Sequence, residues 1–125
     1  MKELKHLMYF ERLLDDAHNE LVRQAEVEGD LAIGYTCFHA PEVLLNLGSC
    51  FSVRLRAPHT TSMELATYYM ANNSCEFSRA ILERALEGNY SFLHAMAGVD
   101  VCEANNRAIE NMEICLLYTS DAADD

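Results

Sequence analysis

Cysteines at the expected starts of helices are the residues of this 125-residue chain with the most informative chemistry. Cys37 follows a short apolar segment and precedes Pro41, whose fixed φ suits the first turn of a helix. Cys75 and Cys102 also stand where helices are expected to begin. A helix N-terminus favours a thiolate over a thiol, and the thiolate is the form that binds metals. The three positions therefore indicate a site that uses thiolate chemistry.

The spacing of these cysteines does not by itself define a metal site. They lie far apart in the sequence, and no Cys-x-x-Cys motif occurs. Free cysteine is among the most frequently buried residues, so a set of purely structural thiols stays open as the alternative. Cys50, which precedes the second expected strand, is interpreted as structural.

Other polar residues near the predicted thiol site have two readings each. His39 could act as a base toward Cys37, or it could simply be solvated. Glu42, in the expected first turn of a helix, could bind substrate or could be favoured there by the helix dipole alone. Arg54 and Arg56 share one face of a strand, where they could bind an anion or face solvent.

Hydrophobic periodicity predicts the elements that must position these residues. Apolar residues at helical spacing indicate one long helix over residues 3–28. Further helices are expected over residues 41–47, 63–71, 75–87 and 101–112. The last of these has Asp100 as its expected N-cap, and Asn105, Asn106 and Arg107 are expected to lie on its surface. Strands are expected over residues 31–35, 51–57 and 92–99.

Strands separated by helices predict an α/β fold with a parallel sheet. The expected architecture is a partial Rossmann- or flavodoxin-like sheet of about three strands with flanking helices, preceded by an N-terminal helix. The carboxyl ends of parallel strands meet at one edge, where Cys37 and Cys102 would then lie. Cys75 could reach the same edge from the start of its helix.

Composition limits the classes of function. The formal net charge is −11, which argues against nucleic-acid binding because such proteins present a basic face. No apolar run is long enough for a membrane span, and the first residues do not form a signal peptide, so a cytoplasmic location is expected. In the cytosol, cysteines are expected to be free thiols, metal ligands or catalytic groups rather than disulfides.

Residues 115–125 are expected to be a non-native tail. Their sequence resembles the in-frame translation of an adapter used in DNA-sequencing libraries, and such segments are excluded from fold reasoning. The alternative is an acidic C-terminus of the protein itself. Under the adapter interpretation, residues 1–114 are the N-terminal α/β part of a longer protein.

Several segments, taken together in their order and spacing, resemble the N-terminal part of the 2-hydroxyacyl-CoA dehydratase family. The family includes 2-hydroxyglutaryl-CoA dehydratase subunits and the related benzoyl-CoA reductase subunits. The segments that carry the resemblance are Gly34-Tyr35-Thr36-Cys37 with Pro41-Glu42, Val53-Arg54-Leu55, Ser74-Cys75-Glu76-Phe77-Ser78-Arg79, Asn89-Tyr90 and Val99-Asp100-Val101-Cys102-Glu103.

The resemblance implies a lyase of anaerobic metabolism that acts as a heterodimer with a second dehydratase subunit. Such a subunit holds a [4Fe-4S] cluster on three cysteines, and an ATP-dependent iron–sulfur activator protein supplies one electron. A (R)-2-hydroxyacyl-CoA then loses water through a ketyl radical anion to give an enoyl-CoA. No catalytic side chain is assigned, and the present fragment alone is expected to be inactive.

Carried over residue by residue, the resemblance assigns Cys37 and Cys75 as the first two cluster ligands. Cys102 is the remaining candidate for a third ligand, which in the family could come from a later domain. Glu42 and Arg54 are the candidates for substrate binding. The function has two alternatives. One is a benzoyl-CoA reductase-like or double-cubane electron-transfer subunit, and the other is a metal-free α/β interaction domain.

Overall fold

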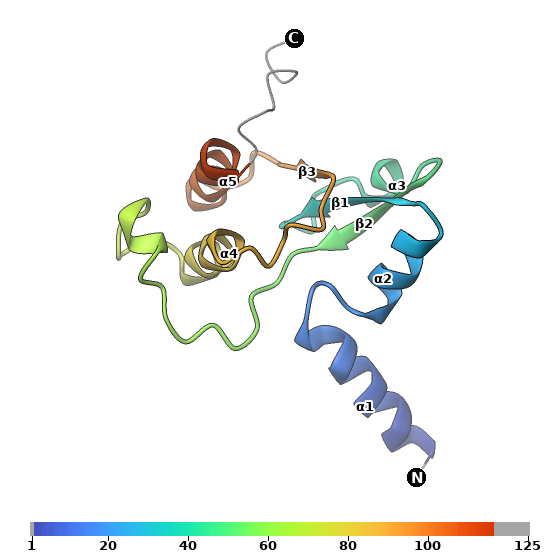
Figure 1. Cartoon of the computed structure of the whole chain (residues 1–125). Coiled ribbons are helices and arrows are strands. Elements are labelled where there is room, and N and C mark those ends of the chain that lie inside the picture. The colour runs from blue at the N-terminus through green and yellow to red at the C-terminus, as the bar shows by residue number, and fades with distance from the viewer. Residues whose placement is uncertain (1, 117–125) are drawn as a thin grey trace.

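The computed structural model describes residues 2–116 and arranges them as helices around a small sheet (Figure 1). The α/β class expected from the sequence is confirmed. In chain order the elements are α1 (Lys2–Asp15), α2 (Glu20–Val27), β1 (Leu31–Tyr35), α3 (Glu42–Leu45), β2 (Cys50–Arg54), the 3-10 turn η1 (Ala66–Tyr68), α4 (Glu76–Leu86), β3 (Ala95–Ala97) and α5 (Glu103–Leu116).

The three described strands are parallel and stand in the order β2-β1-β3, so β1 is the central strand. Leu31 of β1 pairs with Cys50 of β2, and Tyr35 pairs with both Arg54 and Ala97. The strand expected over residues 31–35 is confirmed at both ends, whereas the third strand is shorter than the expected 92–99. Cys37, just past β1, therefore lies at the edge where the strands end, and Cys50 lies at the opposite edge.

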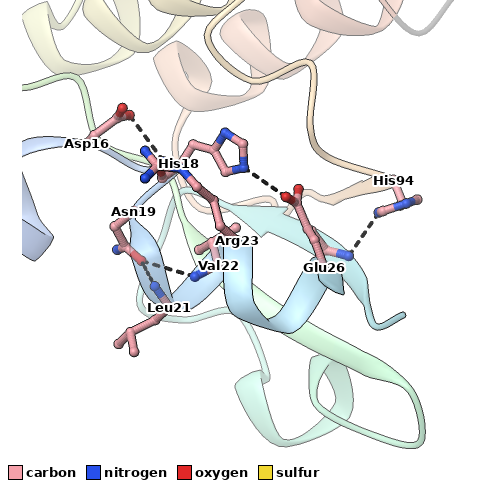
Figure 2. Close-up of polar contacts among 9 residues, drawn as sticks. Asp16, His18, Asn19, Leu21, Val22, Arg23, Glu26 and His94 are labelled. Atoms are coloured by element: carbon pink, nitrogen blue, oxygen red, sulfur yellow. Dashed lines mark hydrogen bonds and ion pairs between the residues drawn. The ribbon is translucent and has the colours of Figure 1, made fainter. Parts of the chain in front are cut away.

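The single helix expected over residues 3–28 is wrong, because α1 and α2 are separate helices. Asn19 accounts for the break: its side-chain oxygen accepts the N–H groups of Leu21 and Val22, which caps α2 (Figure 2). The amide nitrogen of Asn19 also donates to the Leu13 carbonyl at the end of α1, at 3.1 Å. Short polar side chains that bond the backbone in this way compete with a continuous helix.

Two other helices differ from the sequence prediction, one in its length and one in its first residue. The helix expected over residues 63–71 is reduced to η1, and the buried carboxylate of Glu83 accepts the N–H groups of Leu65 and Ala66 at its start. The expected N-cap role of Asp100 is also wrong. Helix α5 begins at Glu103, and the Asp100 carboxylate accepts the side-chain N–H of Asn106 instead, at 2.6 Å.

The core lies where β2, α4 and α5 meet, and α4 and α5 run side by side in Figure 1. Its largest fully buried side chains are Leu55, Ile81 and Leu82. Helix α1 extends away from this core, and its apolar side chains are largely exposed, among them Leu7 at 65%. Among residues 2–116, no helix is both long and apolar enough to cross a membrane.

A histidine side chain joins the start of β1 to the segment before β3. The Ala32 N–H donates to Nδ1 of His94 at 3.0 Å, and the His94 N–H donates to the Ala32 carbonyl at 2.9 Å. Nearby, the ring of His18 stacks on Phe92. The same ring bonds Glu26 at 2.9 Å (Figure 2). These contacts attach α2 and β3 to the edge of the sheet opposite Cys37.

Candidate functional site

The end of β1 places a buried threonine and a half-buried cysteine side by side. Thr36 is buried and Cys37 is partly exposed, and the Cys37 carbonyl accepts the Ala40 N–H at 3.0 Å. The helix that follows, α3, has only four residues, so the helix dipole expected at Cys37 is small. Pro41 stands at the N-cap of α3 rather than at its first helical position.

Glu42 and Arg54, the two residues predicted to bind substrate, lie near one buried tyrosine. The phenol of Tyr35 donates to a carboxylate oxygen of Glu42, and Tyr35 pairs with Arg54 across β1 and β2. Burial, together with the bond to Glu42, raises the pKa of Tyr35 to about 12. The phenol therefore stays protonated at physiological pH and holds the Glu42 carboxylate beside the end of β1.

Cys75 is the N-cap residue of α4, one position before the first residue of the helix. Its pKa is lowered, chiefly by the Ser78 backbone N–H at the start of α4; the Phe77 N–H and the Arg79 charge act in the same direction. Burial opposes these effects only in part, and the side chain is exposed. The helix start expected from the sequence thus gives Cys75 the thiolate character that metal ligation requires.

Cys102 directly precedes α5 and is also exposed. The N–H of Asn105 donates to the Cys102 sulfur at 3.4 Å, and the N–H of Asn106 donates to the Cys102 carbonyl at 3.0 Å. Asn105 is buried, and its side-chain oxygen accepts the hydroxyl of Thr36 at 2.6 Å. Thr36 is the neighbour of Cys37, so this bond joins the segments that carry Cys37 and Cys102.

A pocket of about 500 Å³ connects Cys75 to the first turn of α5. Helix α5 contributes Glu103 and Arg107 to its wall, and Tyr69 contributes an aromatic ring. Glu103 is the neighbour of Cys102, so the pocket brings the Cys75 and Cys102 segments to one place. The Arg107 guanidinium is held by Glu110 at 2.8 Å and by Glu103 at 3.8 Å.

The three cysteine-bearing segments therefore converge on the start of α5, but their side chains do not form a closed metal site. Among the described residues, no three histidine, cysteine, aspartate or glutamate side chains are grouped so that they could hold a metal ion. His39 stacks against Phe38 with ring centroids 4.1 Å apart, and no hydrogen bond joins it to Cys37 within residues 2–116.

Sequence reasoning missed the residues that connect these segments. Asn105 was expected on the surface, yet only 7% of it is exposed. Thr36 and Tyr35 were noted only as parts of a motif, and their hydrogen bonds reach residues distant in the sequence. The one available signal was that an asparagine three positions after Cys102 can bond back to the turn before a helix.

Comparison with known proteins supplies the identity. The family described as 2-hydroxyglutaryl-CoA dehydratase, D-component, matches residues 37–121, a stretch that includes Cys37, Cys75 and Cys102. No curated protein and no solved structure gives a significant match. The match covers well over half of the chain, and the parallel sheet agrees with the α/β fold expected from the sequence. The chain belongs to the 2-hydroxyglutaryl-CoA dehydratase D-component family, and the name of this family denotes a component of a multi-subunit dehydratase.

Proposed function

We propose that this chain is the N-terminal part of an iron–sulfur subunit of a 2-hydroxyacyl-CoA dehydratase. The complete subunit removes water from a (R)-2-hydroxyacyl-CoA to give an enoyl-CoA, through a ketyl radical anion on the thioester carbonyl. Its partners are a second dehydratase subunit and an ATP-dependent iron–sulfur activator protein. We also propose that residues 115–125 are a non-native tail, although the family match extends to residue 121; residues 117–125 lie outside the described part of the chain.

One observation carries this proposal beyond the family match: three cysteine-bearing segments, distant in sequence, meet at the start of α5. Thr36, next to Cys37, bonds Asn105, and the pocket at Cys75 is walled by Glu103, next to Cys102. Structural thiols are usually buried, whereas Cys75 and Cys102 are exposed and Cys37 is partly exposed. Ligands in open parallel sheets bind at this edge, beyond the carboxyl ends of the strands.

The donor set fits a [4Fe-4S] cluster chemically. Cys37 and Cys75 would be its ligands, with Cys102 as the candidate for a third. The Asn105 N–H already bonds the sulfur of Cys102, and the N–H groups at the start of α4 lower the pKa of Cys75; both effects favour the negative charge of iron-bound thiolates. When bound, such a cluster supplies the one-electron chemistry that the side chains of the protein lack.

Glu42 and Arg54 are proposed to contact the substrate from the end of the first two strands. Arg54 is exposed and has no ion-pair partner among the described residues, so its guanidinium is available to a phosphate group of coenzyme A. The Tyr35 phenol fixes the direction of the Glu42 carboxylate. These residues would bind and orient the acyl-CoA, and the acyl group itself is left open.

A metal-free α/β interaction domain is the second candidate function. It is favoured by the exposed apolar side chains of α1 and by the lack of a preformed three-ligand group within residues 2–116. A benzoyl-CoA reductase-like or double-cubane subunit would use the same thiols for related electron transfer.

Anaerobic reconstitution of the complete subunit with iron and sulfide tests the proposal. The unmodified protein and the Cys50→Ser control, whose cysteine lies at the opposite edge, are expected to take up iron and gain visible charge-transfer absorbance. Cys37→Ser and Cys75→Ser are expected to lose most of both signals. Iron uptake that is absent, or that is independent of Cys37 and Cys75, would refute the cluster and favour the metal-free alternative.

A further inference from the structure

A buried polar pair crosses from the sheet to α5 beside the candidate site. The hydroxyl of Thr36 donates to the side-chain oxygen of Asn105 at 2.6 Å, and both residues are buried. Sixty-nine positions separate them in the sequence. Buried polar groups are costly unless they are bonded, so a pair placed here needs a reason beyond filling space.

Asn105 uses three of its groups to connect three segments. Its side-chain oxygen accepts from Thr36, its side-chain nitrogen donates to the Val99 carbonyl at 3.3 Å, and its backbone N–H donates to the Cys102 sulfur at 3.4 Å. Thr36 lies next to Cys37 along the chain. The position of one asparagine therefore sets the end of β1, the segment after β3 and the Cys102 thiol relative to one another.

We propose that Thr36 and Asn105 are a positioning pair that fixes the Cys37 loop against the Cys102 turn. This positioning role rests on the proposed function, because the pair would hold the sulfurs of Cys37 and Cys102 toward one bound iron–sulfur group. Neither residue binds the group itself. Residues that orient metal ligands from behind are typically worth about 10- to 100-fold in metal affinity.

The neighbouring Asn106 provides a matched control on the same helical turn. It is also hydrogen-bonded, to Asp100 at 2.6 Å, but this contact is exposed and does not reach β1. A generic effect of losing an asparagine from α5 would appear in both Asn105→Ala and Asn106→Ala. An effect on the thiol site would appear only in Asn105→Ala.

The threonine offers a sharper comparison. Thr36→Val keeps the shape of the side chain but removes the hydroxyl, which leaves the Asn105 oxygen buried without its donor. Thr36→Ser keeps the hydroxyl and is the conservative rescue. If Thr36→Val does not fold, Asn105→Ala replaces it, because this variant removes the same hydrogen bond from the other side.

The experiment measures iron affinity and the visible spectrum of the reconstituted complete subunit, with circular dichroism to confirm folding. Thr36→Val and Asn105→Ala are expected to bind iron about 10-fold more weakly or worse and to alter the charge-transfer spectrum. Thr36→Ser and Asn106→Ala are expected to match the unmodified protein in both measurements.

The outcomes separate the two proposals. If the unmodified protein binds iron through Cys37 and Cys75 and the folded variants bind it equally well, the positioning role is overturned and the proposed function stands. If the unmodified protein binds no iron, the proposed function fails, and the positioning role fails with it. Weak iron binding by Thr36→Val, together with normal iron binding by Thr36→Ser, supports both the proposed function and the positioning role.

Discussion

At the scale of single residues, the candidate site depends on hydrogen bonds that point at sulfur and oxygen atoms. Cys75 lies at the N-cap position of α4, where nearby N–H groups lower its pKa, and the Cys102 sulfur accepts the N–H of Asn105. Glu42 is held by a phenol. Each contact orders a group that could bind a ligand before any ligand arrives, which lowers the entropy lost on binding.

The first prediction concerns the Cys75 thiol. Its pKa is lowered in the folded chain, so more of it is thiolate at a given pH than in the unfolded chain. Alkylation followed by mass spectrometry is expected to give a Cys75 rate that rises at lower pH in the native protein than in urea. The sign for stability follows: this contribution is present above the pKa of the unfolded thiol and is lost as the pH falls through the folded pKa.

The matched reference is the same residue in the denatured chain, where the bonds from the Ser78 and Phe77 N–H groups are absent. Identical pH–rate profiles for Cys75 in the folded and unfolded chains would contradict the prediction. They would mean that the start of α4 does not activate this thiol.

At the scale of elements, helix α4 organises the segment that precedes it. Glu83, on the buried side of α4, is only 3% exposed, and its carboxylate accepts N–H groups from Leu65 and Ala66. This carboxylate occupies the place of an N-cap for η1, although it comes from a different element. The Glu83 side chain therefore helps to attach the segment between β2 and α4 to the core, into which Ala66 and Met70 also pack.

The second prediction follows from this attachment. Glu83→Ala leaves two backbone N–H groups without their acceptor, which is expected to lower the free energy of unfolding by about 2 kcal/mol or more. Glu83→Gln keeps one carbonyl oxygen and is expected to lose less. Urea titration measures both values, and a Glu83→Ala variant as stable as the unmodified chain would contradict the role of Glu83.

The elements that could be read from the sequence are those whose pattern is local. The strand over residues 31–35 is a compact apolar run, and the Cys75 helix start is marked by short-range capping signals. The break between α1 and α2 could not be read from periodicity, because the apolar spacing continues across Asn19. Similarly, the start of η1 is held by Glu83, a contact across 17 to 18 positions that no local pattern contains.

At the scale of the whole molecule, the buried core and the exposed N-terminal helix are expected to contribute very differently to the free energy of unfolding. The core joins β2, α4 and α5, and Leu82 within it is fully buried. Leu7 on α1 is mostly exposed, and α1 points away from the sheet in Figure 1. Burial of apolar surface is the main favourable term in folding. The contributions of Leu82 and Leu7 to the free energy of unfolding should therefore differ strongly.

The third prediction tests this division with two substitutions. Leu82→Ala is expected to lower the free energy of unfolding by about 2–5 kcal/mol, because it leaves a cavity in the core. Leu7→Ser is expected to change it by less than about 0.5 kcal/mol. Thermal or urea unfolding of the isolated chain distinguishes them, and a Leu7→Ser loss as large as that of Leu82→Ala would show that α1 is packed in solution.

The candidate site itself could be predicted only as a set of neighbours. The parallel order of the strands was enough to place Cys37 and Cys102 toward one edge, and the motif order was enough to indicate the family. The connection through Asn105 and the pocket beside Cys75 depend on how α5 packs against α4. That packing is set by the combined shapes of many side chains, which spacing along one chain does not encode.

The pairing of Ala32 with His94 has a consequence for β3, one of the two edge strands described in this sheet. Because the Ala32 amide proton points at Nδ1, that nitrogen must keep its lone pair, and the single ring proton resides on Nε2. The start of the β1–β3 pairing therefore depends on the orientation of one side chain as well as on backbone hydrogen bonds.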